Sequence, residues 1–176
     1  MPKMDPRQVI DITQDAGLYK KEEPPKKPLV TIPKYHWIRD PIDKRDYIFN
    51  PKTIDTPNSI DLREYCSPIE NQGQLGSCTG NAIAGAIEYI DRKNNKKIDV
   101  SRLFIYYYER LLEGTVNYDS GAFIRDGIKA TYKYGAPLES LWPYNISRFR
   151  IQPSQVAITD GAKRKVTLYE RATDFN

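Results

Sequence analysis

Residues 71–82 read NQGQLGSCTGNA, a glycine-containing turn that leads into a cysteine and then into small residues compatible with a helix. A cysteine attacks a carbonyl carbon as its thiolate, and the unpaired N–H groups and dipole of a helix N-terminus favour that anion. Cys78 is therefore a candidate nucleophile. The alternative is a small buried hydrophobe, the commonest role of an unpaired cysteine. The turn by itself leaves both roles open.

Acyl transfer also requires hydrogen-bond donors directed at the oxygen that becomes negatively charged. The backbone N–H of Cys78 can be one donor, and the side-chain amide of Gln72, six residues earlier, can be the other. A turn through Gly73, Gly76 and Ser77 lets the backbone bring the sulfur to an open cleft. These residues make up a candidate site for acyl transfer.

Composition excludes several other classes of protein. The chain has 176 residues, of which 39% are hydrophobic and 28% charged, and its formal net charge is +4. The lysines are dispersed without a nucleic-acid-binding pattern, and no apolar run reaches the roughly 18 residues of a membrane span. The N-terminus lacks the layout of a signal peptide, which favours an intracellular (cytoplasmic) or viral-particle location. No metal-ligand spacing, phosphate loop or cofactor motif is present, so we expect no metal and no cofactor.

Proline and charge divide the chain into two predicted parts. Nine of the thirteen prolines precede residue 60, and the segment KKEEPPKKPLVTIPK alternates charge pairs with proline. Such a segment has few apolar anchors for a packed core. We therefore predict an extended or partly disordered N-terminal arm over residues 1–55 and a domain over residues 56–176.

Apolar periodicity predicts helices after that boundary. The first begins at or near Cys78 and has three isoleucines at helical spacing on one face, Ile83, Ile87 and Ile90. The second runs from about Ser101, a candidate N-cap, to Glu113, where Gly114 provides the stop.

A third helix is predicted over about residues 122–134, closed by Gly135. Farther along, residues 165–170 read KVTLYE and alternate between apolar and polar side chains, which predicts a strand. No partner strand for this segment is evident in the sequence.

The segment NQGQLGSCTGNAIAGAIEY resembles the active-site segment of the papain-like cysteine peptidases, the family that includes the cathepsins. There a glutamine-glycine pair precedes a glycine-serine-cysteine triplet that opens the central helix, and residues 72–73 and 76–78 match both. The family signature has a cysteine before the glycine and an aromatic residue after the nucleophile. Leu75 and Thr79 occupy those positions. Leu75 removes a family disulfide, and Thr79 removes the aromatic residue, as in some microbial and viral branches.

The resemblance covers about residues 58–150. SIDLREYCSPIENQG is similar to the start of the mature peptidase domain, and DSGAFIRDGIKATYKYGAPLESLWPY is similar to a later helix and a Tyr-Pro-Tyr-type turn, with Trp142 in place of the first tyrosine. Ser120 and Gly121 fall where family members use a glycine pair to hold substrate backbone. Gly121 matches that pair and Ser120 departs from it.

The resemblance implies an α+β, papain-like fold, mainly the helical lobe over residues 56–150 with the start of a β-rich lobe over residues 151–176. It implies proteolysis of a peptide or protein substrate through an acyl-enzyme, with Cys78 as nucleophile and Gln72 in the oxyanion hole. The implied substrate-binding residues are Gly121, Ser120, Gly76 and Ser77.

The general base of such a peptidase is a histidine held by Asn or Asp, and in this family it lies about 130–150 residues beyond the cysteine, past Asn176. The only histidine is His36, which we interpret as a surface or packing residue, the alternative being a base that reaches back to Cys78. Three explanations stay open: a processed or truncated product, a second chain that supplies the His/Asn lobe, or a catalytically incomplete module with a structural, assembly or binding role. Cys66 is predicted to be an unpaired buried thiol.

Overall fold

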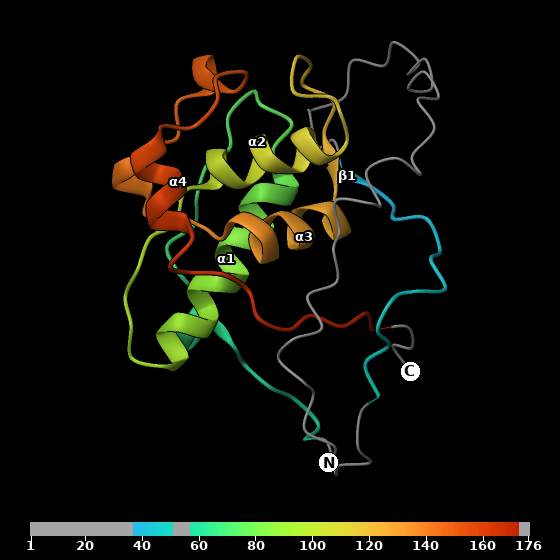
Figure 1. Ribbon diagram of the computed structural model, residues 1–176. Helices are drawn as coiled ribbons and strands as arrows, with labels where there is room; N and C mark the ends of the chain where they lie inside the picture. Colours follow the sequence, from blue (N-terminus) through green and yellow to red (C-terminus); the bar gives the residue numbers. More distant parts are fainter. Residues whose placement is uncertain (1–36, 51–56, 173–176) are drawn as a thin grey trace. The chain divides into compact units, whose positions relative to one another are not determined.

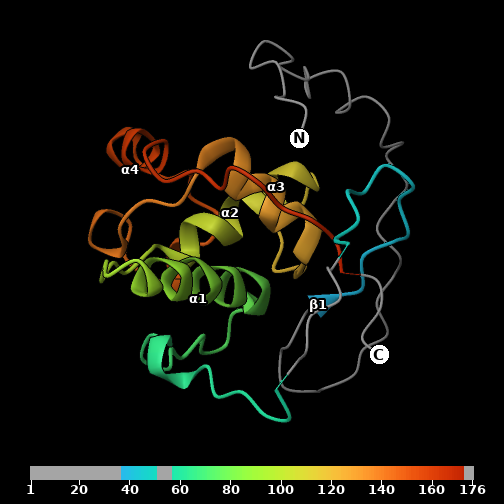
Figure 2. The same cartoon turned by 90° about the horizontal axis from the view of Figure 1, so that it is seen from below.

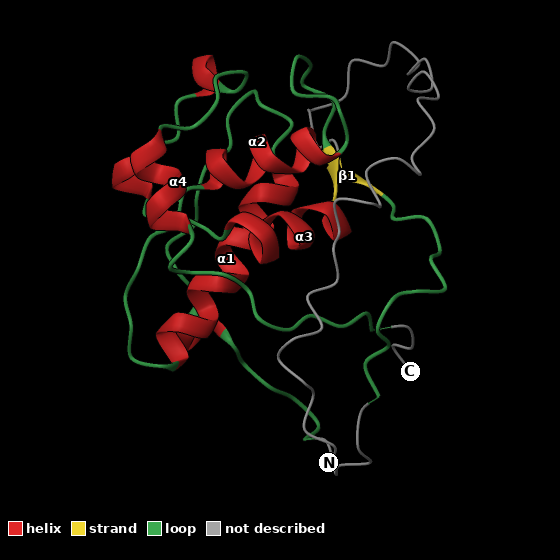
Figure 3. Cartoon of the chain, viewed as in Figure 1, coloured by secondary structure: helices red, strands yellow, loops and turns green. Residues whose placement is uncertain are grey.

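The computed structural model describes residues 37–50 and 57–172, among which three helices pack against one another (Figure 1). These helices are α1 (Cys78–Lys93), α2 (Arg102–Leu112) and α3 (Ile124–Tyr134). A shorter helix, α4 (Gln155–Gly161), follows. Figure 3 shows how little strand accompanies the helices. Short 3-10 helices occupy the connections at Arg63–Tyr65, Glu139–Leu141 and Ile146–Arg148.

Two short strands join the segment before the helical domain to that domain. β1 (Trp37–Ile38) pairs in parallel with β2 (Ala122–Phe123), so that Trp37 lies opposite Ala122. The two views place β1 and α4 on opposite sides of the three packed helices (Figure 1, Figure 2). Residues 37–50 therefore belong to the same compact unit as the helices, and the predicted domain boundary near residue 55 stays a prediction.

The first two predicted helices are confirmed. α1 begins at Cys78, and α2 follows Ser101, whose hydroxyl accepts a hydrogen bond from Phe104 N at 3.2 Å. Gly114, just beyond the last turn of α2, has a φ of +70°, a conformation that glycine adopts without strain. The predicted apolar face of α1 is shorter than expected, because Ile90 is 59% exposed near the end of the helix.

The third helix begins two residues later than predicted, since Ala122 and Phe123 pair with β1 before the chain coils. It ends at Gly135, which has a φ of +77°. A Cβ atom at Gly135 would lie 1.8 Å from the carbonyl oxygen of Gly161 at the end of α4. This glycine thus both stops α3 and lets α4 pack close to it.

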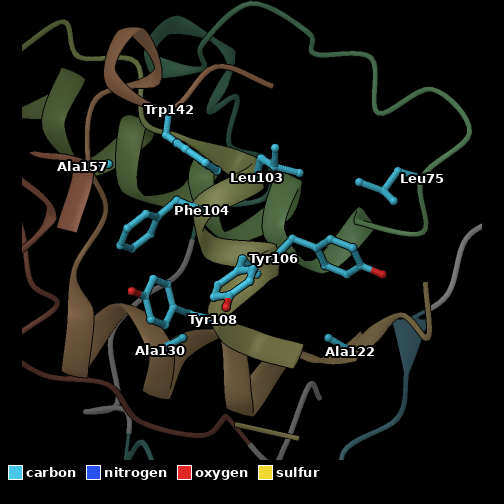
Figure 4. Close-up of a cluster of buried hydrophobic side chains, with 10 residues drawn as sticks. Leu75, Leu103, Phe104, Tyr106, Tyr108, Ala122, Ala130, Trp142 and Ala157 are labelled. Carbon is cyan, nitrogen blue, oxygen red and sulfur yellow. The ribbon is translucent and has the colours of Figure 1, made fainter. Parts of the chain in front are cut away.

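The core is built around α2, which is buried on all sides from Arg102 to Arg110. Figure 4 shows aromatic side chains of α2 in the main cluster. The ring of Tyr108 lies 4.6 Å from that of Phe104 and 4.1 Å from that of Tyr134, measured between centroids. A helix buried all round has no solvated face, so its polar groups must find partners inside the protein.

The strand predicted over residues 165–170 is not present, and α4 was not predicted. The segment runs past the end of α3, where Val166 N donates to the carbonyl oxygen of Thr131 at 3.3 Å. Only Arg171, just beyond the segment, forms a parallel bridge, with Ile48. Alternating side chains produced the strand prediction, but within residues 37–50 and 57–172 no strand lies beside this segment to complete a ladder.

Cys66 was expected to be buried, yet it is exposed, because it follows a 3-10 turn on the surface with its sulfur 3.6 Å from the carbonyl oxygen of Leu62. Among the described residues, none of the helices combines the length and apolar character that a membrane crossing requires.

Candidate active site

The predicted nucleophile is the first residue of the central helix. Cys78 is half-buried rather than enclosed in the core, and no disulfide joins it to Cys66. The turn before it is opened by Gly73, which has a φ of +61°. The sulfur is thus placed by local chemistry, a glycine turn followed at once by a helix.

Gln72 lies on the same turn, and its side-chain amide is half-buried. The amide nitrogen donates to the carbonyl oxygen of Leu75 at 3.0 Å, which folds the side chain back over the turn that ends at Cys78. Asn71 supports the turn from outside, since its side-chain oxygen accepts from Gly73 N at 2.9 Å. The structure therefore brings the predicted oxyanion donor and the predicted nucleophile into one short, internally bonded loop.

Tyr144, which lies 67 residues beyond Ser77 in the sequence, forms hydrogen bonds with this loop. Its hydroxyl donates to the carbonyl oxygen of Gln72 at 2.9 Å and lies 2.5 Å from Ser77 Oγ. A carbonyl can only accept, so the single phenolic hydrogen goes to Gln72 and the Ser77 hydroxyl donates to Tyr144. Burial raises the pKa of Tyr144, which keeps that hydrogen in place. Asn81 completes the set by donating to Ser77 O at 2.8 Å.

Ser77 is the N-cap residue of α1, but its side chain makes no cap hydrogen bond. It is fully buried and directed to Tyr144 instead, so a contact of its side chain with substrate is not what this geometry favours. No role was predicted for Tyr144 from the sequence. The one sequence feature that points to Tyr144 is its position in the segment LWPY, which is similar to a turn of the family. Its neighbours in the sequence do not indicate that it contacts Ser77, 67 residues away.

The predicted substrate-binding pair lies in the loop before β2. Gly121 is buried with a φ of +71°, and its backbone N donates to the hydroxyl of Tyr106 at 3.2 Å. Ser120 is half-buried, and its hydroxyl is 2.9 Å from Thr115 Oγ1 and 2.8 Å from the Gly121 carbonyl oxygen. The loop is therefore held from within, by side chains of its own residues and of α2.

Asp119 connects this loop to the turn of the nucleophile. Its two carboxylate oxygens lie 3.0 and 3.1 Å from Gly76 N, and the hydroxyl of Tyr106 donates to one of them at 2.6 Å. The sequence predictions included Gly76 and Gly121 but not this carboxylate between them. Only the fold shows it, since 43 residues separate Asp119 from Gly76.

Below the nucleophile lies a buried carboxyl group. Thr79, which replaces the aromatic residue of the family signature, donates to Glu109 Oε2 at 2.6 Å. Glu109 is fully buried, and burial raises its pKa to about 8. Its other oxygen has no hydrogen-bond partner. An uncharged, protonated carboxyl is the form that such an enclosed site prefers.

His36 lies outside the described residues, so its predicted surface or packing role stays a prediction. Within residues 37–50 and 57–172, no group of three or more His, Cys, Asp and Glu side chains comes together that could hold a metal ion. The chemistry available at this turn is that of a thiol, side-chain and backbone amides, and buried hydroxyl groups.

A search of known proteins finds a relative of this chain. An uncharacterised peptidase C1-like protein of Acanthamoeba polyphaga mimivirus is 40% identical over 159 residues, and the match covers 78% of this chain and 51% of that protein. The chain thus spans about half the length of this curated relative. No protein-family model matches the chain.

Solved structures show the same relationship. The crystal structure of xylellain, a cysteine protease from Xylella fastidiosa, matches with a TM-score of 0.74 and 37% identity, over 80% of this chain and 59% of that one. The proform of the ragweed pollen allergen Amb a 11, a cysteine protease, shares the fold with a TM-score of 0.52 at 22% identity, over 62% of this chain and 33% of that one. The chain therefore belongs to the papain-like cysteine peptidase family, and the described residues form a partial α+β module of its fold.

Proposed function

We propose that this chain is the helical module of a cysteine-type peptidase, with Cys78 as its nucleophile. The observation that carries the proposal is the position of Cys78, half-buried at the first residue of α1, on the same bonded turn as Gln72. A cysteine that only filled the core would have no need of a turn held by Tyr144 and Asp119. Peptide or protein chains are the proposed substrates.

In the proposed reaction the thiolate of Cys78 attacks the carbonyl carbon of the scissile peptide bond, and the carbonyl oxygen becomes an oxyanion. The backbone N–H of Cys78 and the side-chain amide of Gln72 would donate to that oxygen. Collapse of the tetrahedral intermediate breaks the C–N bond, and the amine leaves with a proton from the general acid. Water then hydrolyses the thioester and restores the thiol.

The reaction also requires residues that bind the substrate and a general base near the sulfur. Gly121 and Ser120 would hold substrate backbone, and Gly76 would contact the substrate between them and Cys78. The general base would be a histidine supplied with its Asn or Asp partner by residues outside this sequence or by a second chain. The greater length of the matched relatives supports this assignment.

The proposal is tested by incubating the pure chain with a peptidyl epoxide that alkylates thiolates and locating the label by mass spectrometry. We expect selective labelling of Cys78. The exposed thiol of Cys66 is an internal control, because accessibility alone would favour it. Cys78→Ser should abolish the selective label, whereas Cys66→Ser should leave it unchanged.

Equal labelling of the two cysteines, or no label at Cys78, would contradict the proposal. That result would support the alternative, a catalytically incomplete papain-like module with a structural, assembly or binding role. The observation in favour of this alternative is a set of exposed apolar side chains in the segment before the site, among them Ile60 and Ile69. Such side chains are typical of surfaces that associate with other molecules.

A further inference from the structure

A chain of hydrogen bonds crosses from the nucleophile turn to the predicted substrate-binding loop. It runs from Gly76 N–H to the carboxylate of Asp119, which also accepts from the hydroxyl of Tyr106, and that hydroxyl accepts in turn from Gly121 N–H. The distances are 3.0, 2.6 and 3.2 Å. Two segments that lie about 45 residues apart in sequence are thereby joined through two side chains.

The direction of each bond follows from what the groups can donate. A backbone N–H only donates, so Gly76 and Gly121 must both give their hydrogens, and the carboxylate of Asp119 only accepts. The one hydrogen of the Tyr106 hydroxyl therefore goes to Asp119. Burial raises the pKa of Tyr106, which is 0% exposed, so its hydroxyl keeps this hydrogen at neutral pH.

Tyr106 is itself held in a rigid place. It lies in the part of α2 that is buried all round, and the guanidinium of Arg110, one helical turn later, lies 4.1 Å from its ring centroid. Arg110 also donates to the carbonyl oxygens of Val116 at 2.7 Å and Tyr118 at 3.2 Å. The same two side chains of α2 therefore fix both the start and the end of the loop that carries Asp119.

We propose that Tyr106 and Asp119 are positioning residues that set the spacing between the Cys78 turn and the Ser120–Gly121 segment. A peptide held along Ser120 and Gly121 would then present its carbonyl carbon to the sulfur at a constant distance. This inference rests on the proposed function. Alignment of this kind matters because small displacements of reacting groups slow a reaction strongly.

A carboxylate suits this position better than an amide. Asp119 uses both oxygens as acceptors at Gly76 N, and an Asn there would turn one of them into a donor facing another donor. The hydrogen bonds to the charged group are also stronger than those to a neutral one. Asp119→Asn should therefore keep the contact with Tyr106 and weaken the contact with Gly76.

The test compares two alkylating reagents on the full chain. A peptidyl epoxide needs alignment along the substrate-binding loop, whereas iodoacetamide reports only the reactivity of the thiol. For Tyr106→Phe we expect the rate of peptidyl labelling at Cys78, as kinact/Ki, to fall about tenfold, while the iodoacetamide rate changes less than about twofold. Asp119→Asn should fall between wild type and Tyr106→Phe. Tyr132→Phe, at an exposed tyrosine of α3, is the matched control and should behave as wild type.

Thermal unfolding followed by circular dichroism identifies the variants that fold. Asp119 is only half-buried, so we expect Asp119→Asn to destabilise the fold less than Tyr106→Phe. If wild type labels Cys78 selectively but both folded variants label as fast as wild type, the positioning role is wrong and the proposed function stands. Parallel loss of the peptidyl and iodoacetamide rates would likewise overturn positioning, because it shows an effect on the thiol itself. A wild-type chain without selective labelling contradicts the proposed function and this inference together.

Discussion

Glu109 shows how a single residue beneath the site departs from the usual behaviour of its type. Its carboxyl is enclosed by α1, α2 and α3, and a Cβ atom on Gly127 would lie 2.4 Å from its unpaired oxygen. Burial raises its pKa to about 8, and the negative charges of Glu113 and Asp126 act in the same direction. The hydrogen bond from Thr79 acts in the opposite direction but is outweighed. At neutral pH most of the molecules therefore carry a protonated Glu109.

This pKa predicts that the free energy of unfolding falls as pH rises from about 4.5 to about 8. The folded state keeps the proton over this range while the unfolded chain loses it, so the contribution is complete below pH 4.5 and lost as pH passes 8. A difference of one pKa unit corresponds to about 1.4 kcal/mol. We therefore expect the ionisation of Glu109 to lower the free energy of unfolding by about 2–4 kcal/mol over this pH range. Urea unfolding between pH 5 and 8 measures it.

Glu109→Gln should remove this decrease in the free energy of unfolding with pH. Glu64→Gln, at an exposed position, should leave the decrease unchanged. A Glu109→Gln variant with the same pH dependence as wild type would show that Glu109 ionises normally in the folded protein.

At the scale of the element, α2 organises the domain because it has no solvent-facing side. The helix is buried from Arg102 to Arg110, including the charged side chains at both of these positions. Arg102 pairs with Glu70 at 3.0 Å and lies 4.1 Å from the ring of Tyr144. The N-cap, Ser101, is buried too and donates from its hydroxyl to the carbonyl oxygen of Trp142 at 2.6 Å.

Ser101→Ala should therefore cost more than the loss of an ordinary cap. It removes the acceptor of Phe104 N and the donor to Trp142 O, and leaves both groups buried without a partner. We expect a loss of about 2–3 kcal/mol in the free energy of unfolding. The matched control is Ser154→Ala at the exposed N-cap of α4, where about 0.5–1 kcal/mol is expected. Equal losses in the two variants would mean that the contact with Trp142 adds nothing.

At the scale of the whole unit, the carboxylate of Asp46 connects three segments that lie far apart in the sequence. Asp46 Oδ2 accepts from Arg125 at 2.6 Å, at the start of α3, and from Arg171 at 2.8 Å near the C-terminal end. Backbone bonds reinforce the junction, since Arg171 N donates to Tyr47 O at 2.7 Å and Phe49 N donates to Arg171 O at 2.9 Å. Residues 37–50 are thus bound to the start of α3 and to Arg171 here, and to β2 through β1.

Asp46→Ala should loosen this junction without unfolding the helices. It leaves two guanidinium groups close together with no anion between them, in a place where the Asp46 side chain is only 14% exposed. We expect amide hydrogen exchange at residues 47–49 and 171 to rise about tenfold, with exchange in α1 and α2 unchanged. Asp43→Ala is the control, because the carboxylate of Asp43 accepts hydrogen bonds from Arg45, only two residues later. Equal exchange in the two variants would contradict the role of Asp46.

The elements that could be predicted from the sequence are those with local signals. The starts of α1 and α2 depend on a turn before Cys78 and a cap at Ser101, and the stop of α3 depends on Gly135, all within a few residues of the helix concerned. α4 was missed because its seven residues are too few to show a clear period. The strand at residues 165–170 was predicted wrongly, because alternation describes a strand only where another strand lies beside it.

The sequence by itself determined that Cys78 opens the central helix, with Gln72 on the turn before it and Gly121 in a later loop. These are properties of backbone conformation, which neighbouring residues decide. Only the tertiary structure decided that Asp119 and Tyr106 join the turn to the loop, that Cys66 is exposed, and that Glu109 has a raised pKa. These depend on burial and on contacts between residues far apart in the chain, and no short-range pattern encodes either.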